Sequence, residues 1–225
     1  AKKEFDMRNY LYKEFKLCIS PVNYLLLAVT AMLLIPSYPC YVPFFYLCLS
    51  IFFIFNNADL NKDLAYSMIL PITKKDIIKS RCILIAVLEI IYILITIPLS
   101  IFYNVANLPE NAAGIEGNVA FYGIMLILET IFTFTFITSY YKKAFKPGKA
   151  FLKAAIVFWV IFIFIEFPFW TKNVFNIPLV KFLDSTDKAS QIKQIPVLAA
   201  GIIVFILGWI LTYKVSAKRF EKVDL

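Results

Sequence analysis

The sequence predicts an all-α integral membrane protein. Apolar residues make up 61% of the chain, aromatic residues 17%, and the mean hydropathy is +0.76. A soluble globular domain is closer to half apolar. The apolar residues are gathered into long blocks that basic segments separate, as is typical of membrane-spanning helices and their connecting loops. We therefore treat residues 1–225 as one transmembrane domain.

The chain begins with a candidate amphipathic helix over residues 1–20. Four of its residues recur at helical spacing, namely Met7, Leu11, Phe15 and Cys18. A helix places all four on one face, and five lysine and arginine residues occupy much of the remaining surface. Such a helix is expected to lie in the headgroup region of the membrane.

Hydropathy predicts six membrane-spanning helices. A hydrocarbon core ~30 Å thick needs about 20 apolar residues in a helix. The first predicted span is about the minimum length, and the second is too short unless its helix continues beyond Asn57. The predicted spans are residues 22–38, 42–57, 82–103, 119–140, 150–170 and 196–213.

The distribution of Lys and Arg predicts the orientation. Four segments are rich in these residues: 1–20, 57–81 and 141–153 contain five each, and 214–225 contains four. The loop 104–118 contains none, and the loop 171–195 contains the remaining four. Because basic loops stay on the cytoplasmic side, both termini are expected in the cytoplasm, which agrees with an even number of spans.

The composition argues against several classes of protein. The absence of histidine excludes Ser–His dyads and His-ligated zinc proteases. The only Gly-Lys pair, Gly148-Lys149, lacks the spacing of a P-loop. The net charge of +8 flanks apolar blocks, which does not favour nucleic-acid binding. We expect no enzymatic activity, no metal and no cofactor in this chain, and its four cysteines to be free thiols.

Three glutamates lie inside predicted spans, namely Glu89, Glu129 and Glu166. An ionisable group at the centre of the membrane costs ~2.5–3.5 kcal/mol or more, so such residues often mark a transport path. Glu129 and Glu166 are candidates for lining a translocation cavity, together with Thr133, one turn from Glu129, and with Glu89. The alternative for each glutamate is an interhelical hydrogen bond, and it stays open.

The loop from Asn57 to Arg81 contains the start signal of a helix. Pro71 disfavours helix in the residue before it. Thr73 and Asp76, three residues apart, have the pattern of a capping box. We expect a short helix with isoleucines on one side and lysines in water. It is either a contact site for another protein or part of a solvated loop.

The segment LPITKKDIIKSR, at residues 70–81 between spans two and three, resembles the permease subunits of bacterial type-2 ABC exporters, such as those that export phenol-soluble modulins or antimicrobial peptides. The resemblance implies a cytoplasmic coupling helix that docks on a separate ATPase subunit, which binds ATP and Mg²⁺. It also implies a second permease chain, as homodimer or heterodimer, in the bacterial cytoplasmic membrane. The cargo would be an amphipathic peptide or a lipid-like compound. The expected ATPase contacts are Ile72, Thr73, Lys74, Lys75, Asp76, Ile77, Ile78 and Lys79.

Two other functions remain open at this point. A proton-coupled secondary transporter would use the three intramembrane glutamates, but it would not explain the capped helix. A non-transporting immunity or scaffold protein would only bind a partner in the membrane. Dependence of transport on ATP or on the proton gradient separates the first from an ABC exporter, and silent Glu→Gln changes would favour the second.

Overall fold

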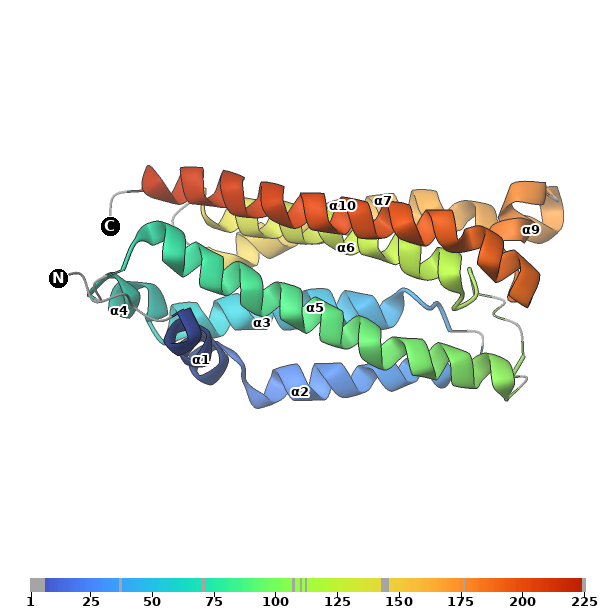
Figure 1. The fold of residues 1–225 in the computed structure, drawn as a ribbon, viewed down its shortest axis with the longest axis horizontal. Coiled ribbons are helices and arrows are strands. Elements are labelled where there is room, and N and C mark those ends of the chain that lie inside the picture. The colour runs from blue at the N-terminus through green and yellow to red at the C-terminus, as the bar shows by residue number, and fades with distance from the viewer. Residues whose placement is uncertain are drawn as a thin grey trace.

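The computed structural model describes residues 7–36, 38–69, 72–106, 108–109, 111, 113–142, 146–175 and 177–223. Within these residues every regular element is helical, which confirms the all-α prediction. Five of the described helices are long and apolar enough to cross a membrane (Figure 1): α3 (Val42–Leu60), α5 (Lys74–Val105), α6 (Val119–Tyr140), α7 (Pro147–Trp170) and α10 (Lys188–Glu221).

The predicted first span is not a regular α-helix. It consists of α2 (Pro21–Ala28) followed directly by a 3₁₀ helix, η1 (Val29–Leu34). At rises of ~1.5 and ~2.0 Å per residue the two reach ~24 Å, short of a ~30 Å hydrocarbon core. The preceding helix α1 (Met7–Cys18) meets them at an 83° bend. The described chain therefore has five spans, or six if this bent pair counts as one.

Helix α1 packs across α3 and α5 with a face that only partly matches the predicted one, since Cys18 is buried and Leu11 half-buried. Glu14 and Cys18 are fully buried, whereas Phe15 is exposed. The side chain of Met7 lies outside the described residues. The prediction is wrong at Phe15, because the neighbouring Glu14 has charged partners in the interior, as shown below.

The loop between α3 and α5 also differs from the prediction. The expected short helix at 72–79 and the expected third span at 82–103 are parts of one continuous helix, α5. Nothing after Thr73 interrupts the helix until Pro98, which it accommodates. A separate short helix, α4 (Asp63–Ile69), lies earlier in the loop. Leu70 and Pro71 lie outside the described residues.

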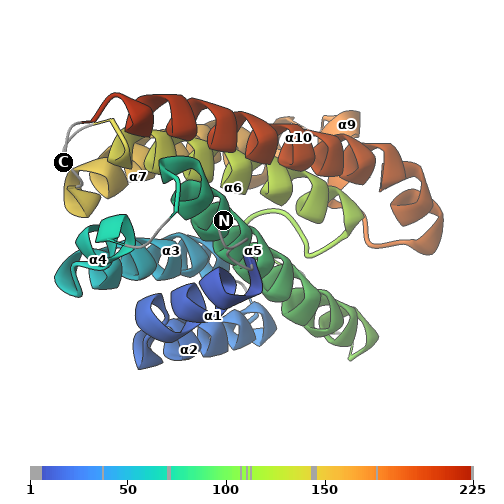
Figure 2. The ribbon, with the colours of Figure 1, turned by 60° about the vertical axis from the view of Figure 1, so that its left-hand side comes forward.

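Helix α6 is the centre of the bundle, with α7 and α10 packed along it (Figure 2). Its contact with α10 depends on glycine. A Cβ on Gly201 would lie 2.3 Å from the carbonyl oxygen of Gly123, and a Cβ on Gly208 would lie 2.0 Å from Thr130. Small residues at such positions allow helix backbones to approach closely in a membrane, so α6 and α10 pack along their length.

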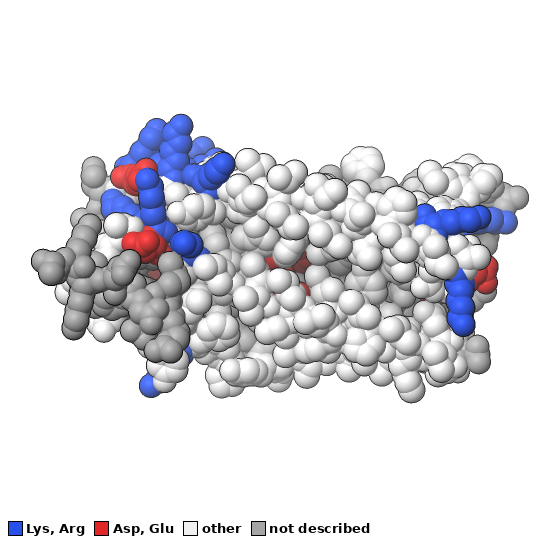
Figure 3. Space-filling view, viewed as in Figure 1, with Lys and Arg blue, Asp and Glu red and all other residues white. Residues whose placement is uncertain are grey.

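The two ends of the bundle differ in what covers them. Helix α1, helix α4 and the last turns of α10 lie at one end, here called the termini end (Figure 1). The short helices α8 (Lys172–Phe175) and α9 (Pro178–Asp184) belong to the opposite end, here called the far end. Figure 3 shows charged side chains gathered at both ends and a band between them that is uncharged except for acidic atoms in a central hollow. Such a band is the surface that a bilayer requires.

Candidate functional site

A buried ionic cluster at the termini end joins three helices. The guanidinium of Arg81, in α5, contacts Glu14 of α1 with its Nε at 2.6 Å from Oε2. Its second arm donates to Asp63 of α4, with Nη2 at 2.7 Å from Oδ2. The side chains of Glu14 and Asp63 are 0% and 1% exposed, respectively. Arg81 therefore links the amphipathic helix and the loop helix to a membrane span.

Lys13 completes the charge balance of this cluster. Its Nζ lies 2.7 Å from Asp63 Oδ1 and 3.3 Å from Glu14 Oε1, and it donates to Ser67 Oγ at 2.5 Å. Two cations thus face two carboxylates, and the cluster as a whole is neutral. Removal of one partner from a buried pair is strongly destabilising, because a buried charge is left uncompensated.

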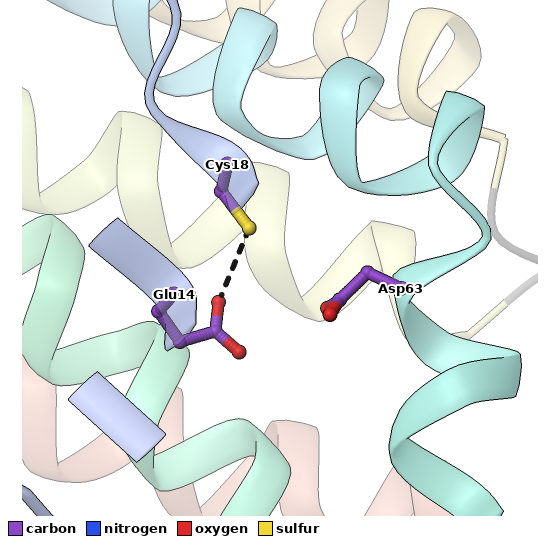
Figure 4. Close-up of side chains that lie close together, drawn as sticks. All are labelled: Glu14, Cys18 and Asp63. Carbon is purple, nitrogen blue, oxygen red and sulfur yellow. Dashed lines mark hydrogen bonds between the residues drawn. The ribbon is translucent and has the colours of Figure 1, made fainter. Parts of the chain in front are cut away.

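Glu14, Cys18 and Asp63 lie close enough to suggest a metal site (Figure 4). Their ligating atoms lie within 4.8 Å of one another. However, the two carboxylates already pair with Lys13 and Arg81. The Cys18 thiol donates to Glu14 Oε2 at 3.4 Å and so keeps the proton that a metal ligand would lose. The cluster fits a structural link better than a metal centre.

A cavity of about 460 Å³ opens beside this cluster. It lies between α3, α4, α5 and the end of α6, and Arg81 forms part of its wall. Lys62 lines it from the turn before α4, where its φ of 49° is in the left-handed region that few residues other than glycine adopt. The surrounding fold therefore holds this turn in a defined shape.

Helix α4 presents apolar side chains to the outside of the termini end. Ile69 is 83% exposed, and Tyr66, Met68 and the preceding Leu60 are also exposed. Its other side is fixed to the bundle by Asp63 and Ser67, which are buried. Exposed apolar residues beyond the membrane band are typical of a surface that a protein partner covers.

The predicted capping box is confirmed. Thr73 Oγ1 accepts from the backbone N–H of Asp76 at 3.2 Å, and Asp76 Oδ2 accepts from the backbone N–H of Thr73 at 3.1 Å. The capped helix is α5 itself, because the turn that starts at Lys74 runs on into the membrane span.

The remaining predicted ATPase-contact residues have varied surroundings. Lys74 donates to the carbonyl oxygen of Val223 at 2.7 Å, and Lys75 lies 3.1 Å from Glu221. The C-terminal segment of this chain therefore covers part of the first turn of α5. Ile77 and Ile78 are buried, Ile72 is half-buried, and Thr73 and Lys79 are exposed.

Glu89 ties three spans together near the middle of the bundle. It accepts from Thr133 of α6 at 2.6 Å and from the indole Nε1 of Trp209 of α10 at 2.9 Å. Thr133 thus contacts Glu89, although the sequence pairs it with Glu129, one turn away. Acidic atoms are visible in Figure 3 at the bottom of a hollow in the uncharged band.

The other two intramembrane glutamates are also buried against this chain. The Cys48 thiol lies 3.6 Å from both carboxylate oxygens of Glu129. Glu166 accepts from the backbone N–H of Ile115 at 2.9 Å, in the loop at the far end. Each acid therefore has a partner inside the protomer, and the role of the three in lining a translocation path stays a prediction.

Sequence reasoning missed the cluster around Arg81. Glu14 lies between Lys13 and Lys16, and nothing in the local sequence indicates that its side chain is buried. The available signal was a helical spacing of four between Glu14 and Cys18, combined with a basic residue, Arg81, only one position before an apolar block.

The comparisons with known proteins assign the chain to a family. Residues 9–221 match the family described as ABC-2 family transporter protein. No curated protein and no solved structure matches the chain significantly. The match covers nearly the whole chain, so the protein belongs to the ABC-2 transporter family. It is a multi-pass membrane permease, and membership in this family implies an ABC ATPase as partner.

Proposed function

We propose that the chain is the permease subunit of an ABC exporter that moves amphipathic peptides or lipid-like compounds out of the cell. A separate ATPase subunit binds ATP and Mg²⁺ and supplies the energy, and two permease chains frame the path. The family match supports the transporter class. The resemblance of residues 70–81 to peptide exporters supports the cargo and the direction.

The observation that carries this proposal is the arrangement of α4 above the ionic cluster. Its exposed side chains, Tyr66, Met68 and Ile69, form a surface for the ATPase, and Asp63 on its buried side is bonded to Arg81. A force applied to α4 therefore acts directly on α5. Thr73 and Lys79, at the start of α5, are also exposed and are further candidates for this contact.

The route continues into the membrane through Glu89. Arg81 and Glu89 lie on the same helix, eight residues apart, and Glu89 is bonded to α6 and α10. Because a helix transmits displacement along its axis, movement of α4 reaches the centre of the bundle through α5. Helix α1 moves with them, since Glu14 is part of the same cluster.

The test requires the ABC ATPase subunit of the same transporter, co-expressed and purified with this chain. Tyr66→Asp and Ile69→Asp are expected to abolish co-purification, because a charge would be buried at the interface. Tyr12→Asp, an exposed aromatic residue on α1, is the matched control and should co-purify normally. Retention of the ATPase by both α4 variants would contradict the docking surface.

Transport assays separate the proposal from its rivals. In vesicles that contain the complex, uptake of a labelled amphipathic peptide should require ATP and persist when the proton gradient is collapsed. Transport that survives ATP depletion and stops with the gradient would identify a proton-coupled carrier instead. No transport under either condition would favour an immunity or scaffold protein.

A further inference from the structure

A groove runs along the membrane face of the bundle between α5 and α10. Its volume is about 590 Å³, within the range of ~300–1,000 Å³ that is usual for ligand sites. The walls are almost entirely aliphatic and aromatic, with α6 forming the floor. Side chains that line it include Leu94 and Ile97 of α5, Leu126 of α6, and Ile202, Phe205 and Ile206 of α10.

The packing of the three helices explains why the groove exists. The contact of Gly123 with Gly201 holds α10 against α6. The Trp209–Glu89 hydrogen bond ties α10 to α5 at the inner end of the groove. From there α5 slopes away from α10 toward the far end (Figures 1 and 2). The groove between α5 and α10 therefore results from the packing of the helices. It is closed at the membrane centre and open toward one surface.

The open end of the groove is polar. Asn104 and Gln191 line it there, and the Ser100 and Tyr122 hydroxyls bond to each other at 2.7 Å on its floor. Lys188 stands one helical turn beyond Gln191, and positions three apart share a helix face. Lys188 is exposed, and the contacts of the described residues include no ion pair to it.

The mouth has charges of both signs. Asp187, next to Lys188, accepts a hydrogen bond from Ser185 at 3.2 Å. Asp184 is paired with Lys172 at 2.6 Å. Lys193 is exposed one turn further along α10 but follows Gln191 by only two residues, so it lies off the groove face. Lys188 is therefore the basic group in line with the groove.

We propose that this groove holds one acyl chain of an anionic phospholipid, with the phosphate at Lys188 and Asn104. The lining from Gln191 to Ile206 extends ~22 Å along α10, somewhat more than the ~15 Å of one leaflet. Apolar walls that end at Asn104 and Gln191, with Lys188 one helical turn beyond, match a lipid chain that ends in a phosphate. The site rests on insertion of the chain in a membrane and does not depend on the nature of the cargo.

The experiment measures lipid retention by native mass spectrometry. The full chain is reconstituted in nanodiscs of phosphatidylglycerol and phosphatidylcholine in equal amounts and then released into mild detergent. Wild-type protein should retain one phosphatidylglycerol per protomer. Ile202→Trp, which fills the groove, should lose most of this lipid, whereas Ile203→Trp on the adjacent exposed surface should retain it.

A second pair of variants tests the headgroup. Lys188→Glu should lower the preference for phosphatidylglycerol over phosphatidylcholine by about fivefold or more, and Lys193→Glu should change it little. Equal lipid retention by both tryptophan variants would overturn the proposal. So would a change in the oligomeric state that only Ile202→Trp produces, because the groove would then be an interface between copies. Unchanged circular dichroism spectra verify that each variant is folded.

Discussion

The two ends of the bundle are held together by different chemistry. At the termini end, Arg81 and Lys13 are buried between Glu14 and Asp63, and the bonds are ionic. At the far end the buried polar groups are amides and carboxylates that bond mainly to the backbone: Asn118 donates to the carbonyl oxygens of Leu183 and Ser185 at 2.7 and 3.1 Å, and Glu166 accepts from the Ile115 N–H at 2.9 Å. The half-buried Lys172–Asp184 pair is the ionic exception there.

This difference in bonding indicates which end of the bundle resists separation of its helices. A charge left alone in the interior costs more than an amide left alone. Three ion pairs join α1, α4 and α5, whereas Lys172–Asp184 is the one ion pair among the described residues of the far end, so we expect separation of the helices to cost more at the termini end. This arrangement suits a protein that receives force at the termini end and opens at the other.

The largest expected effect is that of Arg81→Met. Both carboxylates would remain buried with Lys13 as their one cation within the cluster. We expect the free energy of unfolding to fall by about 3–5 kcal/mol. Titration of the purified protein with sodium dodecyl sulfate measures it. Lys79→Met, at an exposed site in the same helix, is the control, and an equal loss in both variants would contradict the contrast between the ends.

A smaller effect is expected for Gln194→Ala at the far end. Gln194 accepts from the backbone N–H of Ala120 at 3.1 Å and donates to the carbonyl oxygen of Phe182 at 2.8 Å. Loss of both should cost about 1–3 kcal/mol and speed hydrogen exchange in α9. Gln191→Ala removes one exposed bond and should leave that exchange unchanged. Unaltered exchange in Gln194→Ala would show that α9 is held in another way.

A still smaller effect is expected for Glu166→Gln. The amide oxygen of glutamine still accepts from the Ile115 N–H, so stability should change by less than about 1 kcal/mol. Glu166→Ala leaves that N–H without its acceptor and should cost more. The Glu166→Gln variant also tests a role in transport. If protons pass through Glu166, transport should stop in this variant. Normal transport in that variant would remove the residue from such a path.

The smallest effect concerns thiol labelling at Cys40. Burial raises the pKa of the Cys40 thiol to about 12, so at pH 8 it is almost entirely protonated and also shielded. Maleimide should not modify Cys40 in the folded protein, as measured by mass spectrometry. Thr186→Cys, at an exposed far-end position, should add one labelled site. Rapid labelling of Cys40 would mean that the far end opens readily without the partner.

Local signals were the part of the fold that the sequence predicted well. Thr73 and Asp76 form the expected capping box, because capping depends on residues only three positions apart. Helices α6 and α7 begin and end within three residues of the predicted spans, whereas α10 extends eight residues beyond the predicted sixth span at each end. The 3₁₀ stretch at Val29–Leu34 was not predictable in this way, because an apolar run looks the same in either helix type.

The candidate site was less predictable because it depends on distant residues. Arg81 was assigned to a basic loop, yet it is buried against Glu14, which lies far from it in the sequence. The spacing of Met7, Leu11, Phe15 and Cys18 predicts an apolar face, of which Cys18 is buried, but it does not predict that the charged Glu14 is buried beside it. The ATPase contact of the lysines at the start of α5 stays a prediction, and the bonds of Lys74 and Lys75 to the C-terminal segment were not foreseen because their partners are distant in the sequence.

The continuous helix α5 has a mechanical consequence. It is a rod of ~48 Å, long enough to reach from one side of the bilayer to the other. Pro98 removes the backbone hydrogen bond to Leu94, so the rod is stiff from Lys74 to about Leu94 and more easily bent beyond it. A displacement applied to α5 at the termini end would be transmitted to Glu89 with little loss. The last third of α5 can then change its angle, and its side chains form one wall of the groove between α5 and α10.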